Sequence, residues 1–254
     1  KVVNGAAMAS EASSLADQAE RVLPGRAAPM LLKGRAAAAL GKYADALDAL
    51  REAKKRDDHA LDDPQALLAF GRAAARTSHP EEARAAYRML LPRASALAPN
   101  ERGVAYDEAG MIALAAGPTA LGEAVATFRQ AERDSQDIAQ IVAVLGLALA
   151  LDRSGEHAEA KAVLQERIHG DPRPLLKNAV ALGVVGPGTG DGEIDALAAI
   201  GLEWSDPAAA REAWKRYAEH APAVWADHAR ARAGAKAEPP QKSAPKSPPK
   251  KATR

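Results

Sequence analysis

The sequence predicts an all-α fold, a right-handed superhelical solenoid of antiparallel helix hairpins. Ala, Leu, Arg and Glu are abundant while aromatic residues make up 4% of the chain, a composition that favours helix. Apolar residues recur at helical spacing, as at Ala46, Leu50 and Ala53, which form one stripe of a helix. Triplets of the same kind recur, with leading alanines 37, 41, 36 and 50 residues apart. Repeats of about this length are typical of helix-hairpin units.

The triplets also indicate how the two helices of a hairpin pack. Each begins with a small residue, which lets two helices approach closely, and a larger residue one turn later fills the space above it. The later copies are Ala83-Tyr87-Leu90, Ala124-Phe128-Ala131, Ala160-Leu164-Arg167 and Ala210-Trp214-Tyr217, and a degenerate copy, Ala12-Ala16-Ala19, precedes them all. The chain is therefore interpreted as a repeat protein of about six units.

At these residues the chain resembles the tetratricopeptide repeat (TPR) family, whose unit is a helix hairpin of about 34 residues. The matching positions are Gly34, Gly41, Tyr43, Ala46, Leu50 and Ala53 in the first full copy, Gly71, Ala83 and Tyr87 in the second, and Gly155, Ala160, Leu164 and Pro172 in the fourth. Pro24, Pro172 and Pro222 each follow a leading alanine by twelve residues, where the family ends its second helix, and Pro cannot continue a helix. The resemblance covers about residues 6–222 as six degenerate repeats, and implies a TPR-like solenoid.

The expected helices follow in pairs. A first helix at 11–23, from a truncated repeat, ends at Pro24-Gly25; the hairpins are 29–40 with 43–55, 67–76 with 80–91, 101–116 with 119–133, and 137–152 with 158–168. Glycine-containing turns at 41–42, 117–118 and 153–155 join three of these pairs. Asp63 is the expected N-cap before Pro64, and Ser78 or His79 is expected to cap the next helix.

The regular pattern breaks after residue 174. A helix at 175–185 has no evident partner, and the glycine-rich run 186–192 follows it, which explains the step of 50 residues. Helices at 193–203 and 207–220 resume the pattern, and a last helix at 223–233, with Trp225, is expected to cap the solenoid. The predicted regions are 1–174 (TPR-like repeats), 175–234 (irregular helix, connector, last repeat and capping helix) and 235–254 (a Pro/Lys-rich tail).

No catalytic or metal site is predicted. The chain has no Cys, which excludes disulfides, zinc-thiolate sites and thiol nucleophiles. The glycine-rich run misses the G-x-G-x-x-G register because Asp191 stands at the third Gly position, so we interpret it as a helix connector. The six histidines form no HExxH motif, and no G-x-S-x-G motif occurs. We therefore predict a non-enzymatic protein with no cofactor and no small-molecule substrate.

In proteins that this sequence resembles, the first helices of successive hairpins line a concave groove that holds an extended peptide or a partner helix. The face opposite the packed glycines maps onto Leu31, Arg35, Gln65, Leu68, Arg72, Asp107, Met111, Leu114, Leu145 and Leu149, together with Ala38, Ala75 and Asp152. Arg35 and Arg72 fall at equivalent positions. Either they bind a ligand carboxylate, or acids of the solenoid such as Asp45 or Glu82 neutralise them.

Two features near the C-terminus leave alternatives open. The large aromatic residues Trp204, Trp214, Tyr217 and Trp225 either fill the last hairpin and its cap or form an exposed patch for a partner. The tail 235–254 is predicted to be disordered because Pro and Lys dominate it. From Gly234 onward six basic residues face one acid, for a net charge of +5. The tail is a solubilising linker, a P-x-x-P ligand, or a contact for nucleic acid or an anionic membrane.

The predicted function is a protein-protein interaction scaffold or assembly adaptor that binds a peptide or partner helix in its groove. Two alternatives are an accessory component of a bacterial envelope or secretion machine, tethered through a missing N-terminal segment, and a tether acting through the basic tail. The chain opens inside a repeat, which suggests a truncated or processed product. Its longest apolar run, 141–151, is shorter than the ~20 residues of a membrane span. The Ala/Arg-rich composition favours a bacterial origin, in the cytoplasm or periplasm.

Overall fold

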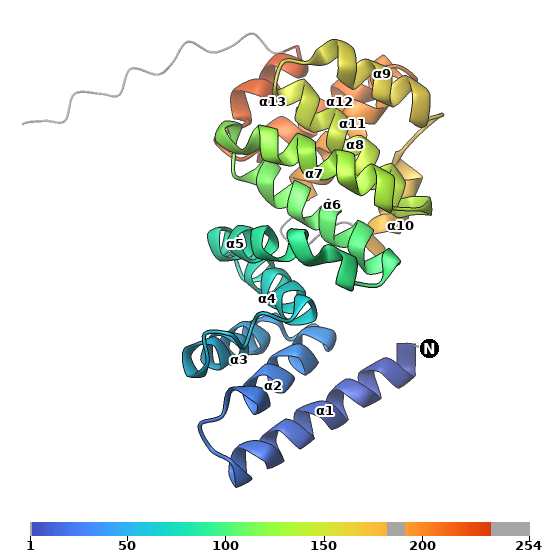
Figure 1. The fold of residues 1–254 in the computed structure, drawn as a ribbon. Coiled ribbons are helices and arrows are strands. Elements are labelled where there is room, and N and C mark those ends of the chain that lie inside the picture. Colours follow the sequence, from blue (N-terminus) through green and yellow to red (C-terminus); the bar gives the residue numbers. More distant parts are fainter. Residues whose placement is uncertain (1, 182–190, 235–254) are drawn as a thin grey trace, which may run out of the picture.

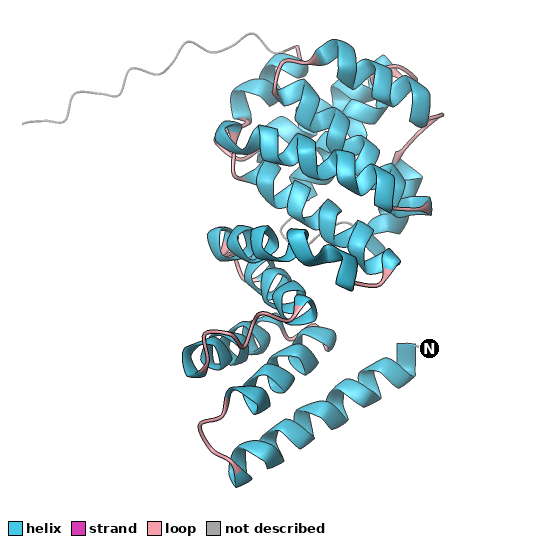
Figure 2. Cartoon of the chain, in the orientation of Figure 1, coloured by secondary structure: helices cyan, strands magenta, loops and turns pink. Residues whose placement is uncertain are grey.

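The computed structural model describes residues 2–181 and 191–234, and every regular element in those ranges is a helix (Figures 1 and 2). Five helix hairpins follow one another in these ranges: α2 (Ala27–Ala39) with α3 (Tyr43–Arg56), α4 (Pro64–Arg76) with α5 (Pro80–Leu90), α6 (Pro99–Ala115) with α7 (Leu121–Asp134), α8 (Asp137–Arg153) with α9 (His157–Arg167), and α11 (Asp191–Leu202) with α12 (Pro207–His220). The remaining elements are α1 (Val2–Val22), α10 (Arg173–Ala181), α13 (Ala226–Arg232) and the 3₁₀ turns η1 (Leu91–Ala96) and η2 (Pro118–Ala120). The predicted all-α hairpin solenoid is confirmed.

The hairpin turns form where the sequence places glycine. Gly41, Gly117 and Gly155 have φ values of 72°, 97° and 87°, a left-handed conformation that L-residues with a side chain rarely adopt. Asp63 caps α4 as expected, because its carboxylate accepts a hydrogen bond from the backbone N–H of Ala66 at 3.3 Å. These local signals determine where the helices are joined, independently of how the helices pack.

Glycine also brings the two helices of a hairpin close together. A Cβ added to Gly71 would lie 2.8 Å from the ring of Tyr87, and one added to Gly110 would lie 2.7 Å from the ring of Phe128. Both aromatic rings are buried. The close approach expected from the triplets is thus present, and the small residue opposite the large one is a glycine of the first helix.

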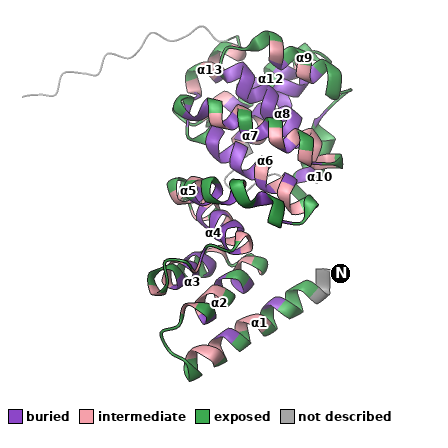
Figure 3. Cartoon of the chain, viewed as in Figure 1, coloured by how far each residue is buried: buried purple, intermediate pink, exposed green. Residues whose placement is uncertain are grey.

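The apolar core consists of two main clusters that meet at α6. One contains Leu47, Leu67 and Tyr87 and extends from α2 to α6, while the other contains Phe128 and Trp214 and extends from α6 to α13. Figure 3 shows α8 buried along most of its length, whereas α1 is largely exposed on one side. The N-terminal half is therefore the open end of the molecule.

Three local predictions differ from the structure. The first helix begins at Val2 instead of residue 11, because the small residues before it continue the helical pattern. The N-cap of α5, His79, makes no side-chain capping bond; its ring lies 3.1 Å from the Thr77 hydroxyl. The helix α10 was expected to lack a partner, yet Ala179 is buried against Val142 of α8. The glycine-rich run up to Gly190 and the tail 235–254 lie outside the described residues.

Candidate partner-binding surface

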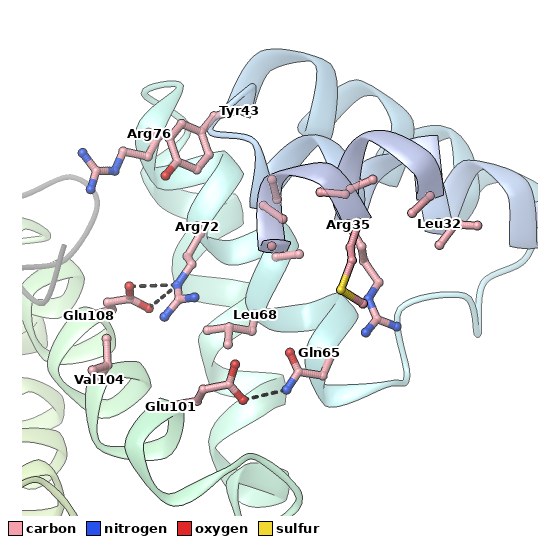
Figure 4. Close-up of a pocket in the computed structure, with 18 of the residues that line it drawn as sticks. Leu32, Arg35, Tyr43, Gln65, Leu68, Arg72, Arg76, Glu101, Val104 and Glu108 are labelled. Atoms are coloured by element: carbon pink, nitrogen blue, oxygen red, sulfur yellow. Dashed lines mark hydrogen bonds and ion pairs between the residues drawn. The ribbon is translucent and has the colours of Figure 1, made fainter. Parts of the chain in front are cut away.

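The candidate surface lies in the N-terminal half, where the first helices of the first three hairpins face α1. Here α1, α2, α4 and α6 enclose a hollow of about 930 Å³, which we call the N-terminal groove (Figure 4). Its lining is Gly5, Met8, Ala9, Ala12, Leu32, Arg35, Ala36, Ala38, Ala39, Tyr43, Gln65, Leu68, Ala69, Arg72, Arg76, Asn100, Glu101, Val104 and Glu108. Of the residues predicted for the groove, Arg35, Ala38, Gln65, Leu68 and Arg72 belong to it.

Polar side chains connect successive inner helices across the floor of this groove. Gln65 donates to the Glu101 carboxylate at 2.9 Å, and Arg72 Nε donates to both oxygens of Glu108 at 2.9 and 3.0 Å. Figure 4 shows these two contacts side by side between α4 and α6. Both join residues 36 apart, close to the repeat length, so they link equivalent positions of neighbouring repeats. That spacing is the signal from which the pairs could have been predicted.

The two stacked arginines are neutralised within the solenoid, but not by the acids considered from the sequence. Arg35 pairs with Asp63 at 3.1 Å and Arg72 pairs with Glu108. Glu82 instead accepts a hydrogen bond from Arg51, with 3.1 Å between Arg51 Nε and Glu82 Oε2. The Arg72 pair is partly enclosed by protein, whereas both members of the Arg35 pair are more than two-fifths exposed. An exposed pair contributes little stability, so Arg35 can exchange its partner at small cost.

Glu108 also anchors the second helix of the preceding hairpin. The Tyr87 hydroxyl donates to Glu108 Oε2 at 2.7 Å, and both side chains are buried. Burial and the neighbouring Glu108 charge raise the pKa of Tyr87 well above its usual value. Tyr87 therefore stays a neutral donor, and this part of the floor is structural.

The wall and the rim of the groove offer groups to a partner. Met8 is 69% exposed and Leu32 is 40% exposed, and both line the groove. The Arg76 guanidinium lies 5.6 Å from the centre of the Tyr43 ring. Among the described residues, no carboxylate lies within ion-pair distance of Arg76. The sequence prediction missed these groups because it placed the start of the first helix after Met8 and chose Leu31, which packs on the core, over Leu32.

Six of the predicted groove residues are not open to a partner. Asp107, Met111, Leu114, Leu145 and Leu149 are between 0% and 3% exposed, and Asp152 is 2% exposed. For these residues the expectation of an open groove is wrong. The inner face of the C-terminal half is covered by other parts of the same chain.

Part of that cover comes from the residues 224–232, which we call the C-terminal segment. The Trp225 indole N–H donates to the carbonyl oxygen of Leu114 at 2.9 Å, and its ring lies 4.5 Å from the Arg153 guanidinium carbon. His228 Nε2 lies 2.8 Å from Asp152 Oδ2, and Arg232 pairs with both Asp152 and Glu203. The expected terminal helix is thus present as α13; Trp225, just before it, reaches α6, and the side chains of α13 reach α8.

The aromatic residues divide between the two alternatives. Trp214, Tyr217 and Trp225 are buried, so they fill the last hairpin and the C-terminal segment. Trp204 is 48% exposed, and the Lys161 ammonium lies 4.3 Å from the centre of its ring. One tryptophan alone does not form the exposed aromatic patch that the second alternative required.

Comparisons with known proteins assign no family to this chain. No protein-family model matches the sequence, and no curated protein matches it. Among solved structures, the crystal structure of the APC/C hetero-tetramer Cut9-Hcn1 is similar over 89% of this chain, with 14% sequence identity and a TM-score of 0.40. The match spans 46% of that chain, so this chain covers less than half of its length.

No group of three or more His, Cys, Asp or Glu side chains is arranged to hold a metal ion within the described residues. None of the described helices combines the length and the apolar character that crossing a membrane requires. The geometry establishes an all-α repeat of helix hairpins with an open groove in its N-terminal half.

Proposed function

We propose that the chain is a non-enzymatic protein-binding scaffold and that its partner binds in the N-terminal groove. The observation that carries the proposal is the exposure of Met8 and Leu32 at the wall of this hollow. Apolar side chains exposed together in a concave surface are typical of interaction sites, because covering them removes apolar area from water. A TPR-like solenoid supports a scaffold role in general, since stacked repeats create extended concave surfaces.

The chemistry of the lining indicates what kind of segment the groove accepts. Met8 and Leu32 suit the apolar face of a helix or an extended peptide. Arg76 stands at the rim, and the terminal nitrogens of Arg72 make no hydrogen bond to the described residues. Guanidinium groups bind carboxylates with two parallel hydrogen bonds. The partner segment is therefore an apolar one that carries an acidic residue where it passes Arg72 and Arg76.

Site-specific crosslinking combined with affinity measurements tests this function. A photoreactive amino acid is placed at position 32 in one protein and at position 89 in a second, and both are exposed to an extract of the source cell. Met89 lies on α5, is 46% exposed and does not line the groove, which makes it the matched control. A partner captured from position 32 and not from position 89 is then purified and its affinity is measured.

Substitutions in the groove are expected to weaken that complex. Leu32→Asp and Arg76→Glu should each lower the affinity at least tenfold, or about 1.4 kcal/mol, because the first places a charge in an apolar contact and the second sets a like charge against the acidic residue of the partner. Met89→Asp should change the affinity less than twofold. Equal losses in all three variants, or no loss in the groove variants, would show that the partner binds elsewhere.

A further inference from the structure

The C-terminal segment is held to the inner face of the solenoid by a few side chains. Its helix α13 packs along α12, while its contacts with α6 and α8 are made by Trp225, His228 and other side chains. Val224 adds a contact to Gly117, in the turn of the third hairpin. The segment thus lies in the solenoid as a bound peptide would, with anchoring side chains in separate places.

Each anchoring side chain of the C-terminal segment contacts groups of complementary chemistry on the inner face. The Trp225 ring lies over Arg153, whose side chain is fully buried, and its N–H reaches one of the last carbonyls of α6. The acids Asp152 and Glu203 receive the basic side chains of His228 and Arg232. The site that binds Trp225 and the acidic site that binds His228 and Arg232 therefore lie at a spacing that residues i, i+3 and i+7 on one face of a helix can reach.

The fit of the segment is incomplete. Arg153 Nε and Nη1, His228 Nδ1 and Arg232 Nε are buried and have no hydrogen-bond partner among the described residues. Buried polar atoms in folded proteins are almost always paired, so this cluster of unpaired atoms leaves the contact short of its full set of hydrogen bonds. All three residues belong to the contact between the C-terminal segment and the inner face.

We infer that the inner face of the C-terminal half is a second peptide-binding surface, occupied by the chain's own C-terminal segment, and that it accepts in its place a partner helix carrying an aromatic residue followed by basic residues at the third and seventh positions. This surface is separate from the N-terminal groove and takes the opposite charge, because Asp152 and Glu203 attract cations. The C-terminal segment acts as a tethered competitor for that partner.

Hydrogen exchange of the intact protein is the first test. If the segment is a displaceable ligand, the amides of α13 should exchange at least tenfold faster than those of α12, since the segment opens without the hairpin beneath it. Equal exchange rates in α13 and α12 would overturn the inference, because the segment would then be a fixed part of the last hairpin.

Peptide binding is the second test. The double substitution Trp225→Ala and Arg232→Ala is made in the full chain, and Arg230→Ala, on the exposed side of the same helix, is the matched control. The probe is a labelled peptide of residues 221–234. The double variant should bind it at least tenfold more tightly than the unaltered chain or the control, because the tethered segment no longer competes at an effective concentration on the order of millimolar.

Two further changes identify the site of binding. Asp152→Asn in the double variant and Trp225→Ala in the peptide should each weaken binding at least tenfold. The inference is overturned if the double variant binds the peptide no better than the control, or if its circular dichroism shows that the last hairpin has lost its helices.

Discussion

At the scale of single residues, Asp107 is the most deeply buried carboxyl among the described residues. It is fully buried on α6, and neither of its oxygens has a hydrogen-bond partner among the described residues. Burial, together with the adjacent Glu108, raises the pKa of Asp107 well above its usual value. In the folded chain Asp107 therefore keeps its proton at pH values where an unfolded chain would lose it.

This shift predicts how Asp107→Asn changes the pH dependence of stability. Below about pH 3 the carboxyl is mostly protonated in both states, so the stability difference between the variant and the unaltered chain should change little with pH there. As pH rises further, the unfolded chain releases the proton and the folded chain retains it, which lowers the free energy of unfolding. The variant lacks this loss, so its relative stability should grow with pH up to the raised pKa. Urea unfolding between pH 4 and pH 8 measures the difference, and a constant difference would contradict the prediction.

The sequence predicted which side chains pack inside the hairpins better than it predicted which charged side chains pair with each other. The small-large rule of the triplets correctly placed Tyr87 and Phe128 in the packing of their hairpins. The partners of Arg35 and Arg72 were not identified, because they depend on how neighbouring repeats are offset. One repeat read alone does not contain that offset.

At the scale of the helix pair, the hairpin of α6 and α7 shows how close approach is maintained. Phe128 on α7 is fully buried, and Gly110 and Gly146 lie against its ring from α6 and α8. A ring held from both sides cannot move away from an added methyl group. Gly110 is therefore a packing requirement, even though glycine weakens a helix.

The substitution Gly110→Ala should lower the free energy of unfolding by about 1–3 kcal/mol, because the new Cβ would lie 2.7 Å from the Phe128 ring. Gly122 on α7 is the matched control, since a Cβ there meets nothing within 4 Å. Gly122→Ala should stabilise the chain, by up to about 1 kcal/mol. Chemical denaturation of both variants measures the two effects, and effects of the same sign would show that the close approach is not what Gly110 provides.

The helix boundaries were predicted well wherever the sequence contains a turn glycine or a capping residue. The turns at Gly41, Gly117 and Gly155 and the cap at Asp63 stand where they were expected. The part of α1 before residue 11 was missed, and the packing of α10 was missed because its contact is with α8 of the preceding hairpin and not with a hairpin partner of its own. Local signals determine where helices begin and end, but not what lies against them.

At the scale of the whole molecule, the groove was only partly predictable. Regular repeats predict an inner face that is equally open in every hairpin. The sequence therefore predicted one groove running through all the hairpins. The contact from Trp225 to Leu114 spans 111 residues, and such a contact depends on the curvature of the entire solenoid. Small rotations from repeat to repeat add up to that curvature, and no single motif contains it.

Because the core consists of two main clusters, we expect a core substitution in one half of the molecule to lower the local stability of that half only. In a solenoid each repeat contacts mainly its neighbours, so the loss of one contact is felt locally. Leu67 lies in the N-terminal cluster and Leu147 in the C-terminal cluster, and both are almost completely buried. Replacing either by Ala leaves a cavity that costs about 2–5 kcal/mol.

Hydrogen exchange of these two variants should therefore differ by region. Leu67→Ala should accelerate exchange in α2 to α5 and leave α8, α11 and α12 unchanged, while Leu147→Ala should do the reverse. Only α6, which contributes side chains to both clusters, should respond to both substitutions. If either variant accelerated exchange evenly along the whole chain, the two clusters would form one cooperative unit. The N-terminal groove could then not change shape on binding without loosening the C-terminal half.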